Sequence, residues 1–274
     1  MHEVFETVAA AAPEIRAGLP GRRRKTEMEN ASGEQQLAAD VWADELLGER
    51  LAALDSVGAD ASEERDDVVD AGDGLLVAVD PLDGSSNLKS NNPMGTIVGL
   101  YDGDLPVSGR DLVAAGFVLY GPITTLLVAD ADGATEYVVE DGDPRDVGAV
   151  TLPDDPTVYG FGGRVPDWTD DFEAVVREIE QELKLRYGGA MIADVNQVLT
   201  YGGIFGYPGL RDRPEGKLRL LFEGAPIAYV LAAAGGSATD GEQSLLDVEC
   251  TELHQRTPVF VGSDEYVSRV EDAL

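Results

Sequence analysis

The chain is poor in basic residues, and this shortage limits what it can bind. Its 274 residues include 20 Lys and Arg against 52 Asp and Glu, which gives a formal net charge of −32. So much negative charge repels nucleic acids and anionic membranes, and neither is expected as a partner. It also repels phosphate compounds, so a phosphate-binding site would need metal ions and local bases to reverse the field.

Cysteine and histidine are almost absent. Cys250 is the single cysteine, so no internal disulfide can form and no oxidising compartment is indicated. His2 and His254 are too isolated to form a histidine metal site. No apolar run reaches the roughly 18 residues of a membrane-spanning helix, and no signal peptide is recognisable. We therefore expect a cytoplasmic protein.

Aromatic residues make up only 7% of the chain, and this scarcity together with the charge is also typical of disordered proteins. Hydrophobic residues nevertheless reach 43%, and they occur in apolar runs separated by glycines, which favours a folded core. The excess of acids indicates a halophilic cytoplasm, where concentrated salt screens the repulsion between them.

Apolar periodicity predicts an α/β fold in the first half. We expect helices over residues 4–19 and 34–54, and strands over 75–79, 96–101, 113–120, 124–129 and 135–139. The later strands are separated by Gly, Pro and Asp, which indicates an antiparallel meander with a tight turn at Asp102-Gly103. The segment 141–157 is rich in Asp, Gly and Pro, and we place the domain boundary there.

The second half alternates strands and helices. We expect strands over residues 158–161, 218–222 and 258–261, and helices over 170–185, 191–201, 226–234 and after Ser263, which would cap the last one. The pattern predicts two α/β domains, residues 1–145 and 146–274.

The most informative stretch is Asp80–Asn87. It follows the apolar run Leu75–Val79, which predicts a buried strand, and Pro81 is expected to end that strand. Asp80 and Asp83 can then converge on a divalent cation at the strand end. The glycine and serines that follow offer backbone N–H groups to a phosphate. This order suits metal-assisted phosphate hydrolysis, although an isolated segment of this kind is also typical of a solvated turn.

Other charged residues stand where they could join this site. Glu223 follows the predicted strand 218–222, and the carboxyl ends of strands are where distant segments meet. Asp40 and Asp44 share one face of the second helix because they are four residues apart. Most other acids are more simply explained as surface charge.

Two groups of bases are candidates for binding anions. Lys217 and Arg219 alternate along a predicted strand and so point to one face, where bases beside carboxylates favour a phosphate site over a solvated pair. The basic run Arg22–Lys25 fits either a solvated connector or an anion site at a subunit interface.

Several blocks, in order along the chain, resemble the fructose-1,6-bisphosphatase family, within the wider group of lithium-sensitive, magnesium-dependent sugar and inositol phosphatases. The similarity extends over roughly residues 28–265. The blocks are residues 33–40, Ser62–Glu64, Asp80–Asn87, Arg186-Tyr187, 193–208, 216–223 and 254–262.

The resemblance implies a layered α/β/α/β/α sugar-phosphatase fold and a Mg²⁺-dependent hydrolase. The reaction would remove the 1-phosphate of fructose 1,6-bisphosphate, a step of gluconeogenesis. Two or three Mg²⁺ would bind per site, with Mn²⁺ as a substitute, and the enzyme would be a homodimer or homotetramer. Residues 1–145 would bind metal and phosphate, and residues 146–274 would bind the sugar.

Site residues follow from the resemblance by position. The implied metal ligands are Glu63, Glu64, Asp80, Asp83, Glu223 and the carbonyl of Leu82. Asp40, working with Glu64, would help to deprotonate the attacking water. The implied substrate-binding residues are Gly84, Ser85, Ser86, Arg186 from a neighbouring subunit, Tyr187, Tyr207, Lys217 and Arg219.

The chain departs from the family at one substrate contact. Members often place an Asn-containing segment against the distal phosphate, whereas this chain has Gly160–Arg164, in which Arg164 is the candidate replacement. No nucleotide site is recognisable near the N-terminus, so inhibition by AMP is not implied.

Three alternative functions remain open. They are an inositol monophosphatase, a phosphatase for another sugar bisphosphate, and a non-catalytic regulator that binds metal and a phosphorylated ligand. Arg186, Tyr207 and Lys217 favour a substrate with a second phosphate. The presence of Asp40 and Glu64 beside the metal ligands favours catalysis, because a regulator needs no base.

Overall fold

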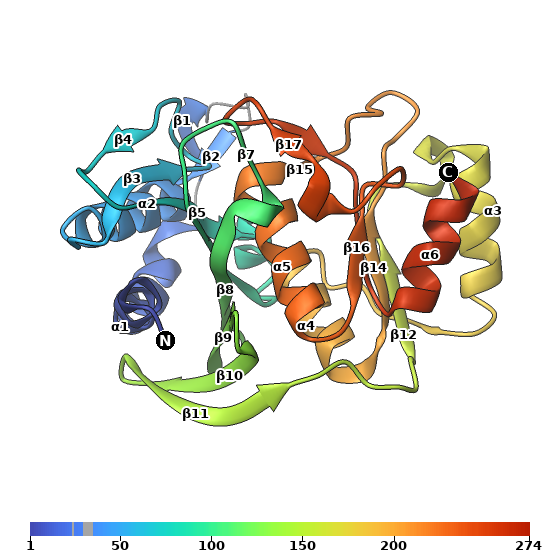
Figure 1. Ribbon diagram of the computed structural model, residues 1–274, viewed down its shortest axis with the longest axis horizontal. Helices are drawn as coiled ribbons and strands as arrows, with labels where there is room; N and C mark the ends of the chain where they lie inside the picture. The colour runs from blue at the N-terminus through green and yellow to red at the C-terminus, as the bar shows by residue number, and fades with distance from the viewer. Residues whose placement is uncertain (24, 30–34) are drawn as a thin grey trace.

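The helices and sheets stack in five layers. A computed structural model describes residues 1–23, 25–29 and 35–274. Its layers follow the order α/β/α/β/α, and the chain termini lie in the two outer helical layers (Figure 1). This confirms the predicted α/β class and the layered sugar-phosphatase fold.

An eight-stranded sheet forms the first β layer, in the order β11-β10-β9-β8-β6-β5-β3-β4. Neighbouring strands are antiparallel except β3 and β5, which are parallel. The strands are β3 (Val57–Ser62), β4 (Val69–Asp70), β5 (Leu75–Asp83), β6 (Met94–Tyr101), β8 (Leu112–Tyr120), β9 (Thr124–Asp130), β10 (Gly133–Glu140) and β11 (Asp143–Val150).

A five-stranded sheet forms the second β layer, in the order β13-β12-β14-β19-β16. Its strands are β12 (Val158–Phe161), β13 (Lys184–Leu185), β14 (Gly203–Tyr207), β16 (Ser237–Thr239) and β19 (Val259–Gly262). Short two-stranded ladders join the remaining strands: β1 (Lys25–Glu29) with β2 (Gln35–Leu37), β7 (Val107–Ser108) with β17 (Glu249–Cys250), and β15 (Leu218–Arg219) with β18 (Arg256–Thr257).

Three pairs of helices cover the sheets (Figure 1). The first pair, α1 (Glu3–Gly18) and α2 (Ala38–Leu51), packs on the outer face of the large sheet, and α4 (Met191–Tyr201) and α5 (Ala225–Ala233) lie between the sheets. The third pair, α3 (Asp170–Ile179) and α6 (Asp264–Ala273), covers the small sheet. No helix in the described part of the chain is long and apolar enough to span a bilayer.

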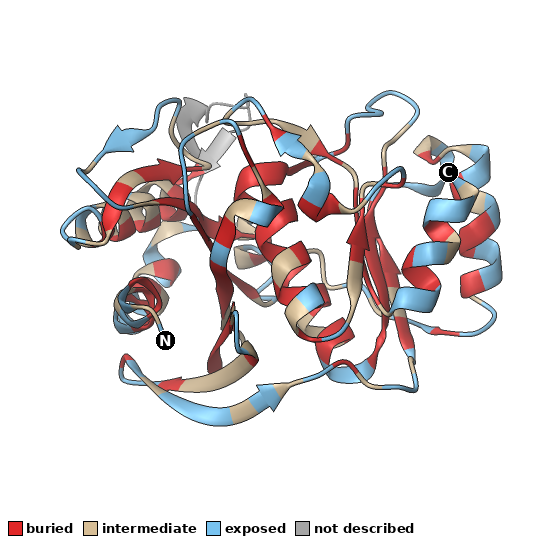
Figure 2. Cartoon of the chain, viewed as in Figure 1, coloured by how far each residue is buried: buried red, intermediate tan, exposed pale blue. Residues whose placement is uncertain are grey.

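Three apolar clusters among the described residues fill the interfaces between the layers. The largest contains α4, α5 and the sheet faces against them, where Phe222 and Ile227 are fully buried. The predicted face of α1, including Val4, Val8 and Ile15, is buried against the large sheet. Figure 2 shows the strands between the helices as buried along most of their length, while α3 and α6 expose an outer face.

Two predictions about the first half were wrong. The helix expected from residue 34 begins at Ala38, because residues 35–37 pair with β1 as β2; residues 30–34 lie outside the described part. No tight turn joins β6 to β8 at residues 102–103, since β7 and a 3₁₀ turn at Gly109–Asp111 intervene. The segment 141–157, where we placed the domain boundary, contains β11, which pairs with β10. The two-domain division stays a proposal, and this pairing favours a boundary after residue 150.

Three elements of the second half differ from their predicted extents. The helix expected over 170–185 ends at Ile179, and the chain returns to the sheet as β13. The strand expected over 218–222 stops at Arg219 and continues as a π-helix, η5 (Leu220–Gly224). Ser263 precedes α6, but its side chain makes no capping bond; its Oγ accepts a hydrogen bond from the Gly203 N–H instead, at 3.0 Å.

The basic run near residue 22 is engaged with the protein itself where it is described. Arg22 stacks over the Trp42 ring at 4.0 Å and donates to the Gly18 carbonyl, and Arg23 donates to the Lys89 carbonyl. The Arg24 and Lys25 side chains lie outside the described residues. These contacts favour a connector that is packed onto the first layer.

Candidate active site

Most of the predicted site residues line one pocket of about 150 Å³. It lies where the carboxyl end of β5, the start of α4 and the β15–η5 segment meet. The predicted residues in its wall are Asp40, Glu63, Glu64, Asp80, Leu82, Asp83, Gly84, Ser85, Ser86, Tyr207, Lys217, Arg219 and Glu223. Arg186 and Tyr187 are not among the residues of this wall.

A β-bulge brings Asp80 and Asp83 together. We expected Pro81 to end the strand after Val79, but β5 continues to Asp83 with a shift in register between Asp80 and Asp83. The extra residue turns the strand locally without breaking its pairing to β6, as bulges beside functional sites do. The Pro81 carbonyl accepts from the Thr96 hydroxyl at 2.8 Å, which holds the bulge in place.

A π-helical turn supplies the third acid. In η5, Glu223 turns back so that its Oε2 accepts from the Arg219 N–H at 2.6 Å. Ligand atoms of Asp80, Asp83 and Glu223 all lie within 4.8 Å of one another, and the three residues are buried. Insertions of this kind in a helix are common at functional sites.

The three carboxyl groups are electrostatically strained. Burial raises the pKa of Asp80 and of Glu223 well above their ordinary values, and the charge of Glu63 raises both further. Burial also raises the pKa of Asp83 to about 6, although the Ile192 N–H at the start of α4, 2.8 Å from its Oδ2, opposes the shift. A divalent cation would offset the cost of burying these charges and the repulsion between them. Ligands that are all oxygen atoms suit Mg²⁺. The residues present therefore fit a divalent metal site.

Asp40 stands at the first turn of α2, facing the same pocket. Its Oδ2 accepts from the Leu37 N–H at 2.7 Å, and Oδ1 is buried without a hydrogen-bond partner among the described residues. Burial raises the pKa of Asp40 to about 6, against the lowering effect of the Leu37 N–H. A carboxylate with this pKa is suited to accept a proton near neutral pH.

The two predicted bases occupy different environments. Arg219 is buried, and its guanidinium lies 3.4 Å from Glu63, so it offsets carboxylate charge inside the pocket. Lys217 is exposed at the mouth, with its Nζ 5.5 Å from the centre of the Tyr207 ring. Both positions place positive charge beside an acidic site.

Tyr187 and Tyr207 are joined by a hydrogen bond between their hydroxyl groups at 2.8 Å. Tyr207 lines the pocket, whereas Tyr187 is 46% exposed. Arg186 bonds to Gln197 at 3.2 Å and stacks over Tyr201. Arg164 pairs with Asp167 on the surface and is absent from the pocket wall, which does not support it as a replacement distal contact.

Sequence reasoning missed Gly189, Met191 and Leu218, which also line the pocket. The segment before α4 is held by Asp194, whose Oδ1 accepts from the Gly188 N–H at 2.7 Å. Gly189 has φ of 84°, a conformation that favours glycine. The paired glycines at 188–189 and the buried acid six residues later are the sequence signal for this support.

Asp194→Asn is expected to stabilise the protein at pH 7.5. Burial raises the pKa of Asp194 from 3.8 to about 6, so the folded protein favours the neutral carboxyl group. The stability gained from protonation is therefore fully present below pH 4 and is lost as pH rises through 6. Asparagine keeps an acceptor for Gly188 without the charge. We expect the free energy of unfolding to rise by about 1–2 kcal/mol at pH 7.5 and by about half as much at pH 5.

Urea unfolding in molar KCl at the two pH values measures this effect. The matched control is Asp102→Asn, an exposed acid, which corrects for the general benefit of removing one negative charge. Equal increases in the free energy of unfolding for the two variants at both pH values would contradict the view that the buried charge of Asp194 destabilises the protein.

Comparisons with known proteins agree with this geometry. The family models for the N-terminal domain and the C-terminal domain of fructose-1-6-bisphosphatase match residues 5–148 and 152–274. The chain belongs to the fructose-1,6-bisphosphatase family. Dependence on a divalent metal is general in this family and agrees with the cluster of Asp80, Asp83 and Glu223.

Relatives in this family match nearly the whole chain. The class 1 fructose-1,6-bisphosphatase of Halobacterium salinarum is 61% identical, with 99% of this chain and 96% of the relative covered. The holo form of the Leishmania major fructose-1,6-bisphosphatase superimposes with a TM-score of 0.91 at 30% identity, covering 98% and 91%. A putative sedoheptulose-1,7 bisphosphatase from Toxoplasma gondii superimposes with a TM-score of 0.84 at 27% identity, covering 99% and 91%.

Proposed function

We propose that this chain hydrolyses the 1-phosphate of fructose 1,6-bisphosphate, giving fructose 6-phosphate and phosphate. The observation that carries the proposal is the convergence of Asp80, Asp83 and Glu223 within 4.8 Å, directly beside Gly84–Ser86. Membership of the family supports the choice of substrate. Gluconeogenesis in a cytoplasm of high salt is the setting in which we expect it to act.

Two or three Mg²⁺ would be held by Asp80, Asp83, Glu223, Glu63, Glu64 and the carbonyl of Leu82, with Mn²⁺ as a substitute. When bound, such ions lower the pKa of a ligated water and neutralise charge on the leaving oxygen. The buried carboxylates supply the negative charge and oxygen ligands for them. Arg219 would hold Glu63 within this cluster, since the two side chains already lie 3.4 Å apart.

Asp40 and Glu64 would accept the proton of the attacking water. Asp40 faces the pocket from α2, opposite the β5 carboxylates, and its pKa of about 6 leaves it ionised at neutral pH but basic enough to take a proton. The scissile phosphate would lie against the backbone N–H groups of Gly84 and Ser85, with Ser86 beside them. Positioning of this kind supplies most of the catalysis in phosphoryl transfer.

The distal phosphate and the sugar would contact Tyr187, Tyr207 and Lys217, with Arg186 reaching in from a neighbouring subunit. The shared hydrogen bond of the two tyrosines presents two hydroxyl groups together, and Lys217 lies at the mouth. A homodimer or homotetramer would also cover Leu185 and Tyr201, which are 62% and 43% exposed beside Arg186. Exposed apolar residues around a base favour an interface there.

One alternative has a specific observation in its favour. The likeness to the putative sedoheptulose-1,7 bisphosphatase favours tolerance of a longer sugar. An inositol monophosphatase and a non-catalytic regulator stay as outcomes of the test.

The test is phosphate release in molar KCl, with and without Mg²⁺. The substrates are fructose 1,6-bisphosphate, sedoheptulose 1,7-bisphosphate and inositol 1-phosphate. We expect Mg²⁺-dependent release with kcat/KM highest for fructose 1,6-bisphosphate and at least 100-fold lower for inositol 1-phosphate. Preference for the monophosphate would overturn the two-phosphate pocket, and no release from any substrate would favour the regulator.

A further inference from the structure

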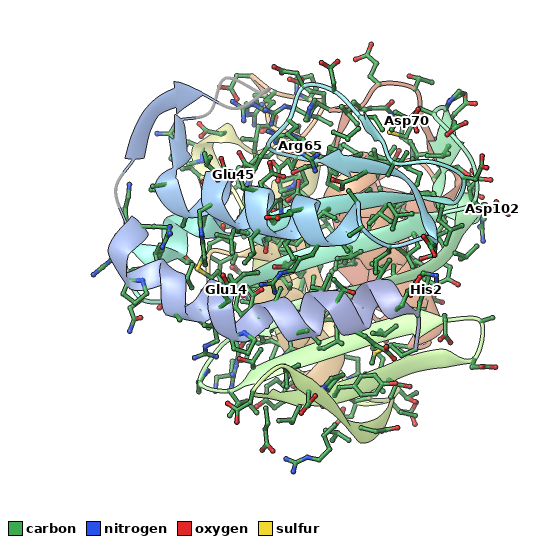
Figure 3. The ribbon with its side chains drawn as sticks, turned by 90° about the vertical axis from the view of Figure 1, so that its left-hand side faces the viewer. His2, Glu14, Glu45, Arg65, Asp70 and Asp102 are labelled. Carbon is green, nitrogen blue, oxygen red and sulfur yellow. The ribbon has the colours of Figure 1, made fainter. Side chains whose placement is uncertain are left out.

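Arg65 joins three separate segments of the site. Its Nε lies 3.1 Å from Asp44 on α2, and its Nη2 lies 2.6 Å from Asp60 on β3. Its main-chain carbonyl lies 2.8 Å from Nε2 of His254, which is stacked against Phe222. Figure 3 labels Arg65 on the side of the molecule that α1 and α2 cover.

The helix that receives Arg65 is the one that carries Asp40. Asp40, Asp44 and Gly48 follow each other at intervals of four residues and so lie along one stripe of α2. Gly48 lies directly against the ion pair, since a Cβ there would be in ordinary van der Waals contact, 3.4 Å from the Asp60 carboxylate and 3.6 Å from the Arg65 guanidinium. The Arg65 guanidinium therefore packs on the same stripe of α2 that carries Asp40, the proposed base.

The same residue ends the turn that carries two proposed metal ligands. The Glu63 N–H donates to the Val79 carbonyl at 3.0 Å, and the Arg65 N–H donates to the Ser62 carbonyl at 3.2 Å. These bonds fix the turn to the sheet. The side chain of Arg65 adds a link from the turn to α2.

We propose that Arg65 is a positioning residue that holds Asp40 at a fixed distance from Glu63 and Glu64. This inference rests on the proposed function. The base and the metal ligands come from different elements, so their separation depends on the contact between α2 and the turn. Arginine suits this task because its planar fork bonds Asp44 and Asp60 at once, whereas lysine offers a single ammonium group.

Burial makes the link stiff. Asp60 is 1% exposed, and burial raises its pKa while the charge of Arg65 lowers it. A buried carboxylate without its partner is unfavourable, so Asp60 keeps Arg65 in place. Asp44 is the milder place to break the link, because its side chain is 13% exposed at the edge of α2 and its loss leaves Asp60 paired with Arg65.

The experiment compares Asp44→Ala and Arg65→Lys with the parent. The control is Arg50→Gln, a change on the same helix as Asp44 that breaks an exposed ion pair with Glu14 of α1. Three quantities are measured in molar KCl: kcat and KM for fructose 1,6-bisphosphate at saturating Mg²⁺, binding of Mn²⁺ followed by its electron paramagnetic resonance signal, and the melting temperature.

We expect Asp44→Ala to lower kcat at least tenfold while KM changes less than twofold. Arg65→Lys should lower kcat similarly and also weaken Mn²⁺ binding three- to tenfold, because it loosens the turn itself. Arg50→Gln should stay within twofold of the parent in every measurement. If Arg65→Lys does not fold, the kcat of Asp44→Ala decides.

Two results would overturn the proposal. In the first, Asp44→Ala keeps its kcat within twofold of the parent. In the second, its measured kcat falls only in proportion to the fraction of protein that is still folded, which is the mark of a purely structural contact. Failure of the proposed function is distinguishable, because the parent would then bind Mn²⁺ without hydrolysing the sugar phosphate. In that case the difference in Mn²⁺ affinity between Arg65→Lys and Arg50→Gln would still show whether Arg65 holds the turn.

Discussion

Asp83→Ala is expected to abolish hydrolysis, with kcat at least 10³-fold below the parent, while the protein stays folded. Asp83 contributes a carboxylate oxygen to the cluster with Asp80 and Glu223, so its loss removes a metal ligand. Stability should change little, because removing one of three buried like charges offsets the lost bond to the Ile192 N–H. Phosphate release and circular dichroism in molar KCl check the two halves of this result.

Asp83→Asn refines the same measurement. Asparagine retains an acceptor for the Ile192 N–H but lacks the charge, so it should fold as the parent does and bind Mg²⁺ at least tenfold more weakly by calorimetry. The matched control is Asp102→Ala, an exposed acid outside the pocket. Turnover near the parent's rate in either Asp83 variant would refute the placement of the metal site.

Lowering KCl from 3 M to 0.05 M is expected to reduce the melting temperature by roughly 10–20 °C, which for a chain of this length corresponds to about 5 kcal/mol. The net charge is −32, and dilute salt no longer screens the repulsion between the acids. Most of the ion pairs, such as Arg110 with Asp247, are exposed and contribute little stability. Differential scanning calorimetry across a series of KCl concentrations measures how the melting temperature depends on salt.

Sucrose provides the control for this salt effect. It stabilises folded proteins by exclusion from their surface without screening charge. We expect sucrose at low salt to restore only a small part of the melting temperature that KCl restores. A melting temperature independent of KCl would refute the interpretation of the acidic composition as halophilic.

Local patterns predicted the elements whose residues carry their own signal. Helix α4 was predicted with its observed ends, and the Asp80–Asn87 segment was placed correctly after a buried strand. Both depend on neighbouring residues: apolar spacing in the helix, and an apolar run followed by Gly and Ser at the turn. Glu223 was placed near this segment because it follows a predicted strand, whereas the gathering of Asp40 and Glu63 came from the family resemblance, because spacing alone does not show which of the many acids meet.

The errors fall where tertiary pairing overrides local preference. Strand β11 contains Pro144 and Gly148, which argue against a strand, yet pairing along β10 extends the sheet through them. The π-helix at 220–224 interrupts an apolar run that periodicity cannot separate from a strand. Arg65 went unnoticed because its importance lies in partners 5 and 21 residues away, which nothing in the local sequence marks.

The carboxylate cluster draws Asp80 and Asp83 from the first half of the chain and Glu223 from the second. Neither half alone therefore contains a complete site, so each would be inactive if the gene were split after β11. A bound divalent ion would also act as a removable cross-link between the two halves. Magnesium depletion should then speed amide hydrogen exchange along β5 and η5 together, while α3 and α6, which do not line the metal site, keep their protection.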